Sequence, residues 1–111
     1  MANLAIKGHA TRGKEVIEIL EMLGGKQTWL RNANSSKHYY YINSANELDA
    51  ISIGNSRLVY NFKTFTLEEF FEKFPYKVGD NVVYKRSSKL EVVRMYWDGA
   101  LDVVRYDVQA I

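Results

Sequence analysis

The C-terminal third of the sequence combines cationic and aromatic side chains in a pattern that could bind a peptide or a nucleic acid. A basic polar segment, KRSSK at 85–89, joins two strand-like runs, and aromatic residues lie on both of them. Small β modules often hold such ligands on a rim where cations lie beside aromatic rings. The candidate site comprises Tyr84, Lys85, Arg86, Lys89, Tyr96 and Trp97. The alternative is a charged hairpin loop that keeps the sheet soluble.

A second candidate is an anion site at the start of an expected helix, where Arg12 and Lys14 flank Gly13. The first N–H groups of a helix lack intrahelical partners and carry the positive end of its dipole. A guanidinium group can add two parallel hydrogen bonds to a phosphate. The alternative is an ordinary helix start capped by Thr11, because the further glycines of a phosphate-binding loop are missing.

A third candidate is the tyrosine run that follows Lys37 and His38. In a strand, Tyr39 and Tyr41 share one face and Tyr40 takes the other. Tyr39 and Tyr41 could therefore stack on the bases of a single-stranded nucleic acid. The alternative is that one face is core and the other a half-exposed aromatic surface, because tyrosine suits strands in general.

The acidic residues do not form a catalytic pair. Glu68 and Glu69 lie in the first turn of an expected helix, and Asp102 and Asp107 lie on opposite faces of an expected strand. Nucleophile-elbow, HExxH and Walker motifs are absent. The chain has no cysteine and two histidines, which excludes disulfides and thiolate metal sites. We expect no catalytic residue, no metal site and no cofactor, and hence no enzyme.

The composition is that of a globular protein. Of 111 residues, 47% are hydrophobic, 25% are charged and 14% are aromatic. The net charge of +2 is too small to require a nucleic-acid partner. No apolar run approaches the roughly 20 residues of a membrane span, and the start MANLAIKGHA lacks a signal-peptide core. We expect a cytoplasmic protein without membrane contact.

Two helices are expected. The first spans about 11–23, with an apolar stripe at Val16, Leu20 and Leu23 and a Gly-Gly end. The second spans 67–74 and begins at a T-x-x-E capping box, Thr66 to Glu69. Phe65 and Phe70 have the spacing of a hydrophobic staple, and Pro75 ends the helix.

Strand patterns fill most of the remaining chain. Residues 3–9 suggest a short strand, and 27–31 suggest another. The runs at 38–43, 48–54 and 57–65 predict an antiparallel meander with a hairpin turn at 54–56. After Pro75, strands are predicted at 82–84, 90–97 and 101–108, with a primed turn at Asp98-Gly99.

Two blocks, ATRGKEVIEILEMLGGK (10–26) and FTLEEFFEKFPYKVGDNV (65–82), resemble the ends of a family of short, uncharacterised proteins. Such proteins occur in gut bacteria, their phages and their mobile elements. The resemblance implies an accessory protein of phage origin whose variable regions carry individual specificity. Some phage proteins of this size disable host nucleases, CRISPR effectors among them. A host defence nuclease is therefore one candidate partner, and the chain one candidate anti-CRISPR inhibitor.

The tail separately resembles part of an SH3-like barrel of the KOW or Tudor kind. The shared features are V-G-D-x-V at 78–82, a variable loop, a long strand, a W-D-G turn and Y-x-V at 106–108. The resemblance implies a partial barrel, because such barrels need about five strands and three are predicted here.

These observations predict an α+β fold. Residues 1–75 form an α+β domain of two helices on an antiparallel meander, and 76–111 form a three-stranded SH3-like extension. The predicted core comprises Val16, Leu20, Leu23, Ile42, Ile51, Ile53, Phe65, Phe70, Phe74, Val82, Val92 and Val104.

The leading functional prediction is a non-enzymatic accessory protein that docks on a host protein. The alternatives are a nucleic-acid-binding module that uses the tail, and a small homo-oligomeric component whose unpaired tail strands are completed by another copy.

Overall fold

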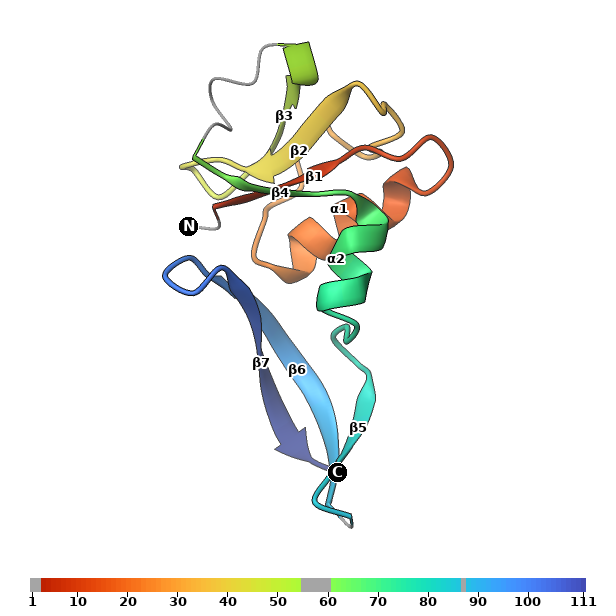
Figure 1. Ribbon diagram of the computed structural model, residues 1–111, viewed down its shortest axis with the longest axis vertical. Coiled ribbons are helices and arrows are strands. Elements are labelled where there is room, and N and C mark those ends of the chain that lie inside the picture. Colours follow the sequence, from red (N-terminus) through yellow and green to blue (C-terminus); the bar gives the residue numbers. More distant parts are fainter. Residues whose placement is uncertain (1–2, 55–60, 87) are drawn as a thin grey trace.

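The computed structural model describes residues 3–54, 61–86 and 88–111, and its fold is α+β (Figure 1). A four-stranded sheet, a pair of helices and a three-stranded sheet follow one another along the long axis of the molecule (Figure 1). In chain order the elements are β1 (Leu4–Lys7), α1 (Gly13–Met22), β2 (His38–Ile42), β3 (Leu48–Ser52), β4 (Lys63–Phe65), α2 (Leu67–Lys73), β5 (Asn81–Tyr84), β6 (Ser88–Asp98) and β7 (Val103–Ala110). No helix of this described part is long and apolar enough to cross a membrane.

The first sheet is mixed, with strand order β3-β2-β1-β4. β2 pairs antiparallel with both β1 and β3, but β4 pairs parallel with β1, so the predicted meander is wrong at its last strand. β3 and β4 occupy opposite edges and do not form a hairpin with each other. The predicted turn at 54–56 lies mostly outside the described residues, as does the first part of the predicted strand 57–65.

The segment between α1 and β2 also differs from expectation. The short strand predicted at 27–31 is absent from the described structure, where Lys26 makes a single parallel bridge to Glu47. The segment instead packs tightly against the start of α1, since Ala33 is fully buried and its carbonyl accepts a hydrogen bond from His9 N at 3.0 Å.

Helix α1 begins two residues later than predicted, and Thr11 does not cap it. His9 Nδ1 accepts hydrogen bonds from the backbone N–H groups of Thr11 and Arg12 at 3.2 Å. Asn34 Oδ1 accepts one from Gly13 N, also at 3.2 Å. The N–H groups at this helix start are thus satisfied by side chains outside the helix, which the local sequence pattern does not reveal.

The predicted glycine end of α1 is confirmed, and so is the Thr66 half of the predicted capping box at the start of α2. Gly24 has a φ of 103°, in the left-handed region. The N–H of Gly24 donates to Glu21 O and the N–H of Gly25 donates to Leu20 O, as in the Schellman motif that ends many helices. At α2, Thr66 Oγ1 accepts from Glu69 N at 3.1 Å. The rings of Phe65 and Phe70 meet edge to face with centroids 5.9 Å apart.

The tail forms an open antiparallel sheet of order β5-β6-β7, as predicted. An irregularity at Val93 shifts the pairing of β6 with β7 by one residue, so Val92, Met95 and Trp97 lie on the same face. The loop after Asp98 is not the predicted two-residue turn. β7 begins at Val103, and the positive φ of 52° belongs to Asp102.

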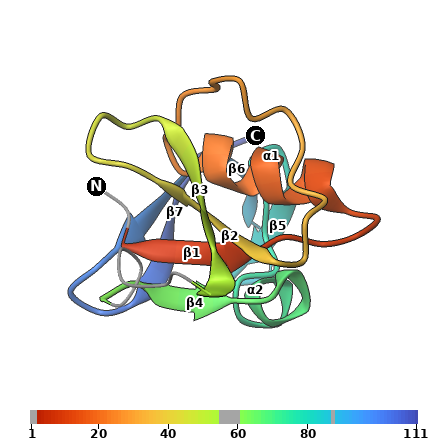
Figure 2. The same cartoon turned by 90° about the horizontal axis from the view of Figure 1, so that it is seen from above.

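One hydrophobic core joins the two parts of the chain. The inner face of the tail sheet contributes Val92, Met95, Trp97 and Val104 to the same buried cluster as the helices and the helix-facing side of the first sheet. The predicted core residues are buried, except that Ile53 and Val82 are half-buried. Viewed along the long axis, the first sheet lies over the helices and the tail strands (Figure 2).

Candidate docking surface

The residues of the first predicted site do not come together. Lys85 and Arg86 form the turn at the far end of the β5–β6 hairpin, and Lys89 follows on β6. Trp97 lies near the opposite end of the same strand. The extended strand between Lys89 and Trp97 spans roughly 25 Å at about 3.3 Å per residue. Tyr84 ends β5, and its side chain lies outside the described part of the structure.

Trp97 is a core residue, contrary to its predicted role in binding. Its side chain is 8% exposed, and its ring meets those of Phe65 and Phe74 edge to face at 5.9 and 6.1 Å. Alternation along β6 predicts this placement once the inner face is identified, because Trp97 follows Val92 and Met95 on that face. Trp97 therefore anchors the tail to the helices.

Tyr96 lies on the outer, polar face of the tail sheet. The guanidinium carbon of Arg94 lies 4.8 Å from the centroid of its ring, and Arg105 is its cross-strand neighbour on β7. Arg94 and Arg105 also pair with Asp107 and Asp98 at 3.2 and 2.7 Å. The Arg105 side chain lowers the pKa of Asp98, assisted by the N–H groups of the following loop. The charges on this part of the outer face are therefore paired within the chain.

The predicted anion site contains the protein's own carboxylates. Arg12 Nε donates a hydrogen bond to the Glu15 carboxylate. Arg12 Nη1 lies 3.9 Å from Glu68 Oε1, and the same oxygen lies 3.1 Å from His9 Nε2. The hydrogen bond from Arg12 lowers the pKa of Glu15. Lys14 is exposed on α1. The positive charge at this helix start is thus offset within the chain.

The tyrosine run follows the predicted alternation but does not present two open rings. Tyr40 faces the helices in the main core, while Tyr41 lies on the far face in a small cluster with Ala5 and Ile51. Tyr41 is 7% exposed and meets Phe62 edge to face at 5.5 Å. Burial raises the pKa of its phenol, and the nearby Asp49 adds to the shift. Tyr39 is half-buried beside this cluster.

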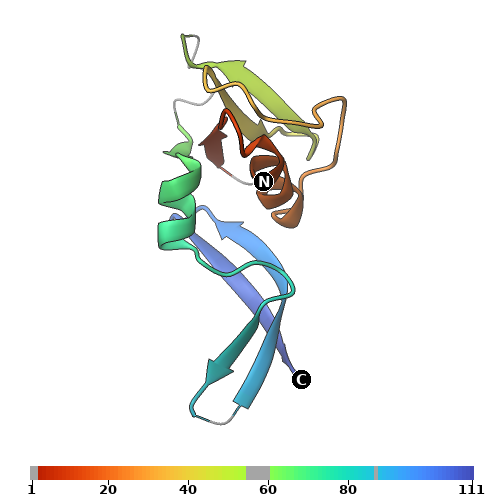
Figure 3. The same ribbon diagram turned by 90° about the vertical axis from the view of Figure 1, so that its right-hand side faces the viewer.

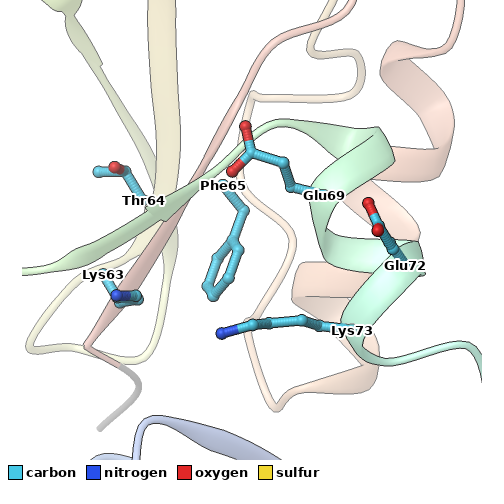
Figure 4. Close-up of a pocket in the computed structure, with 6 residues that line it drawn as sticks. All are labelled: Lys63, Thr64, Phe65, Glu69, Glu72 and Lys73. Atoms are coloured by element: carbon cyan, nitrogen blue, oxygen red, sulfur yellow. The ribbon is translucent and has the colours of Figure 1, made fainter.

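An open groove of about 500 Å³ lies between β4 and α2 (Figure 4). It is lined by Lys63, Thr64, Phe65, Glu69, Glu72 and Lys73. The described residues hold no group of three side chains that could ligate a metal ion. The groove is a mixed-charge surface without identifiable chemistry.

A partly exposed apolar sheet face lies on the far half of the tail sheet, which extends well beyond the helices (Figure 3). Here the inner face continues from Val82, which packs against the core, through Leu90 to Val108 and Ala110 on β7. Val108 is 44% exposed, Ala110 is exposed, and Leu90 and Val82 are half-buried. We call these four residues the tail face. The sequence prediction missed it, although the alternation of apolar residues on β6 and β7 continues beyond the length that the core covers.

Comparison with known proteins yields no match to a family model, to a curated protein or to a solved structure. The resemblances to a phage-associated family and to SH3-like barrels therefore stay predictions.

Proposed function

We propose that this protein is a non-enzymatic accessory protein of phage or mobile-element type that docks on a host protein through the tail face. The observation that supports the proposal is an apolar sheet face that continues beyond the core, at Leu90 and Val108, and remains open. Protein-binding surfaces combine an apolar centre with a polar rim. Lys85 and Arg86 on the hairpin turn supply a cationic rim, so the partner would offer an apolar patch bordered by acidic groups.

Two other candidate sites on the described surface are less suited to such docking. The groove beside α2 has charged walls of both signs, and Arg12 at the start of α1 is paired with carboxylates of the same chain. Neither offers an apolar centre of the kind that supplies most binding energy in protein interfaces. A host defence nuclease such as a CRISPR effector is one candidate partner, from the resemblance of the two sequence blocks.

The test uses two substitutions on the same hairpin. Leu90→Asp places a charge in the tail face, whereas Val83→Asp places one on the opposite face, where Val83 is 71% exposed. Tagged protein would be used to capture partners from a lysate of a gut bacterium that hosts such phages. We expect one protein to be recovered in stoichiometric amount by the wild type and by Val83→Asp, and to be lost with Leu90→Asp. Circular dichroism checks that both variants fold.

Two results would count against the proposal. Recovery of no stoichiometric partner by the wild type would remove its basis. Equal loss with both variants would mean that the tail face has no special role.

A nucleic-acid ligand is the second candidate, favoured by the exposed cations Lys85 and Arg86 at the hairpin turn. Binding through phosphates would weaken steeply as salt rises. Failure of both DNA and RNA to bind at low salt would end this candidate.

A further inference from the structure

The tail sheet ends in an unusually long open edge. Strands at the edges of the two sheets are β3, β4, β5 and β7, with 5, 3, 4 and 8 residues. Natural proteins protect edge strands by keeping them short or by placing proline, lysine or bulges on them. β7, VVRYDVQA, has no proline, glycine or lysine, its two charged residues are of opposite sign, and the pairing irregularity belongs to β6. Figure 1 shows its outer edge without a neighbouring strand.

The direction of the backbone groups on β7 follows from one hydrogen bond. Ile111 N donates to Lys89 O at 3.1 Å, so odd-numbered residues of β7 turn their N–H and C=O groups toward β6. Residues 104, 106, 108 and 110 therefore turn theirs toward the open edge. Within the described part of the chain, these groups make no hydrogen bond to another element.

The sequence of β7 is complementary to itself in the antiparallel direction. If two copies pair about Tyr106, Tyr106 lies opposite Tyr106 of the second copy, and Val104 lies opposite Val108. These are residues with outward backbone groups, as a hydrogen-bonded antiparallel pairing requires. In the same register Arg105 lies opposite Asp107 on the outer face, twice by symmetry. A shift of the centre to Asp107 would place Asp107 opposite Asp107 of the second copy, which brings like charges together.

The charged side chains have capacity for the added contacts. Arg105 uses Nε for Asp98, and Asp107 uses Oδ2 for Arg94. A guanidinium group carries five N–H donors and a carboxylate has two oxygens, so each can bind a second partner. Arg105 and Asp107 are about half exposed, with side-chain exposures of 48% and 49%.

We propose that a second copy of this chain pairs with the open edge of β7, antiparallel and centred on Tyr106, to give a two-fold symmetric dimer with a continuous six-stranded sheet. The two-fold axis is perpendicular to the sheet, so both tail faces lie on the same side of it. The dimer needs no host protein and goes beyond the proposed function, because it can be tested on the purified chain.

The decisive experiment reverses the two facing charges separately and then mixes the variants. Arg105→Asp gives two Asp–Asp contacts across the interface, and Asp107→Arg gives two Arg–Arg contacts. A mixed pair restores two opposite-charge contacts. Light scattering after size exclusion should show twice the mass of the 12.8 kDa chain for the wild type. Each variant alone should dissociate about tenfold more readily, and the mixture should recover the dimer.

A second variant tests the backbone pairing. Val108→Pro removes an N–H that points to the open edge, so the pairing of β7 with β6 should persist in circular dichroism while the dimer is lost. The proposal is overturned by a monomeric wild type at high micromolar concentration, by single charge variants that dimerise as the wild type does, or by a mixture that stays monomeric. A folded Val108→Pro variant that remains dimeric would overturn it as well.

Discussion

The two sheets of the molecule differ in how fully their apolar side chains are buried. The first sheet covers one face with two helices and places a small aromatic cluster on the other, so its apolar residues find partners within the chain. The outer face of the tail sheet is mostly polar and its inner face is apolar, and the core covers the inner face at Met95 and Trp97 but leaves Val108 44% exposed. Folding requires burial of the apolar residues of the first sheet, whereas the exposed part of the tail's inner face adds little to stability. This contrast is the reason that both proposals use the tail.

The largest expected effect on stability is in the core between the first sheet and the helices. Phe70 is fully buried and its ring contacts Phe65, Phe71 and Phe74. Phe70→Ala should lower the free energy of unfolding by about 3–5 kcal/mol, because it leaves a cavity that the surrounding rings cannot fill. Leu90→Ala in the tail face should cost roughly 1 kcal/mol, since Leu90 is half-buried. Urea denaturation of both variants measures the difference, and similar losses would contradict the comparison.

A smaller effect is expected where backbone segments touch. A Cβ on Gly13 would lie 2.3 Å from Asn34 Oδ1 and 2.6 Å from the carbonyl carbon of Ala33. Gly13→Ala should cost about 1–3 kcal/mol, because the 32–35 segment would have to move. In the tail loop, Gly99 has no atom closer than 3.5 Å to such a Cβ. Gly99→Ala should therefore stay within about 0.5 kcal/mol of the wild type in the same denaturation assay.

How far the sequence predicts this fold depends on the range of the interactions involved. The capping of α2 by Thr66, the left-handed Gly24 and the three tail strands are set by neighbours within a few residues, and the prediction was right for them. The parallel pairing of β4 with β1 and the role of Asn34 at the start of α1 join distant segments. No local pattern encodes such contacts.

The candidate site was predicted less well than the fold. Residue type placed Trp97 among binding residues because tryptophan is common in interfaces, but its position on the inner face of β6 puts it in the core. The tail face and the open edge of β7 depend on where the core ends, which is a property of the assembled molecule. Alternating apolar residues identify an inner face without showing how much of it is covered.

The smallest expected effect is on the pH dependence of stability, through the pair of Arg12 and Glu15 at the start of α1. The pKa of Glu15 lies below its usual value of 4.5 because Arg12 bonds its ionised form. The unfolded chain therefore binds more protons than the folded one in this range, so the contribution is complete above pH 4.5 and is lost as pH falls through the folded pKa. Glu15→Gln should flatten this part of the curve of unfolding free energy against pH. An unchanged slope would show that the pair does not contribute.

The eleven residues of β6 run without a break in the chain from the helices to the outer hairpin. The ring of Trp97, near one end of the strand, packs against Phe65 and Phe74, so this end of β6 is fixed in the core while the other end carries the hairpin. A ligand that immobilises the hairpin would therefore damp fluctuations of the helix pair. Slower amide hydrogen exchange in α2 would report such an event from a distance, without any label at the contact itself.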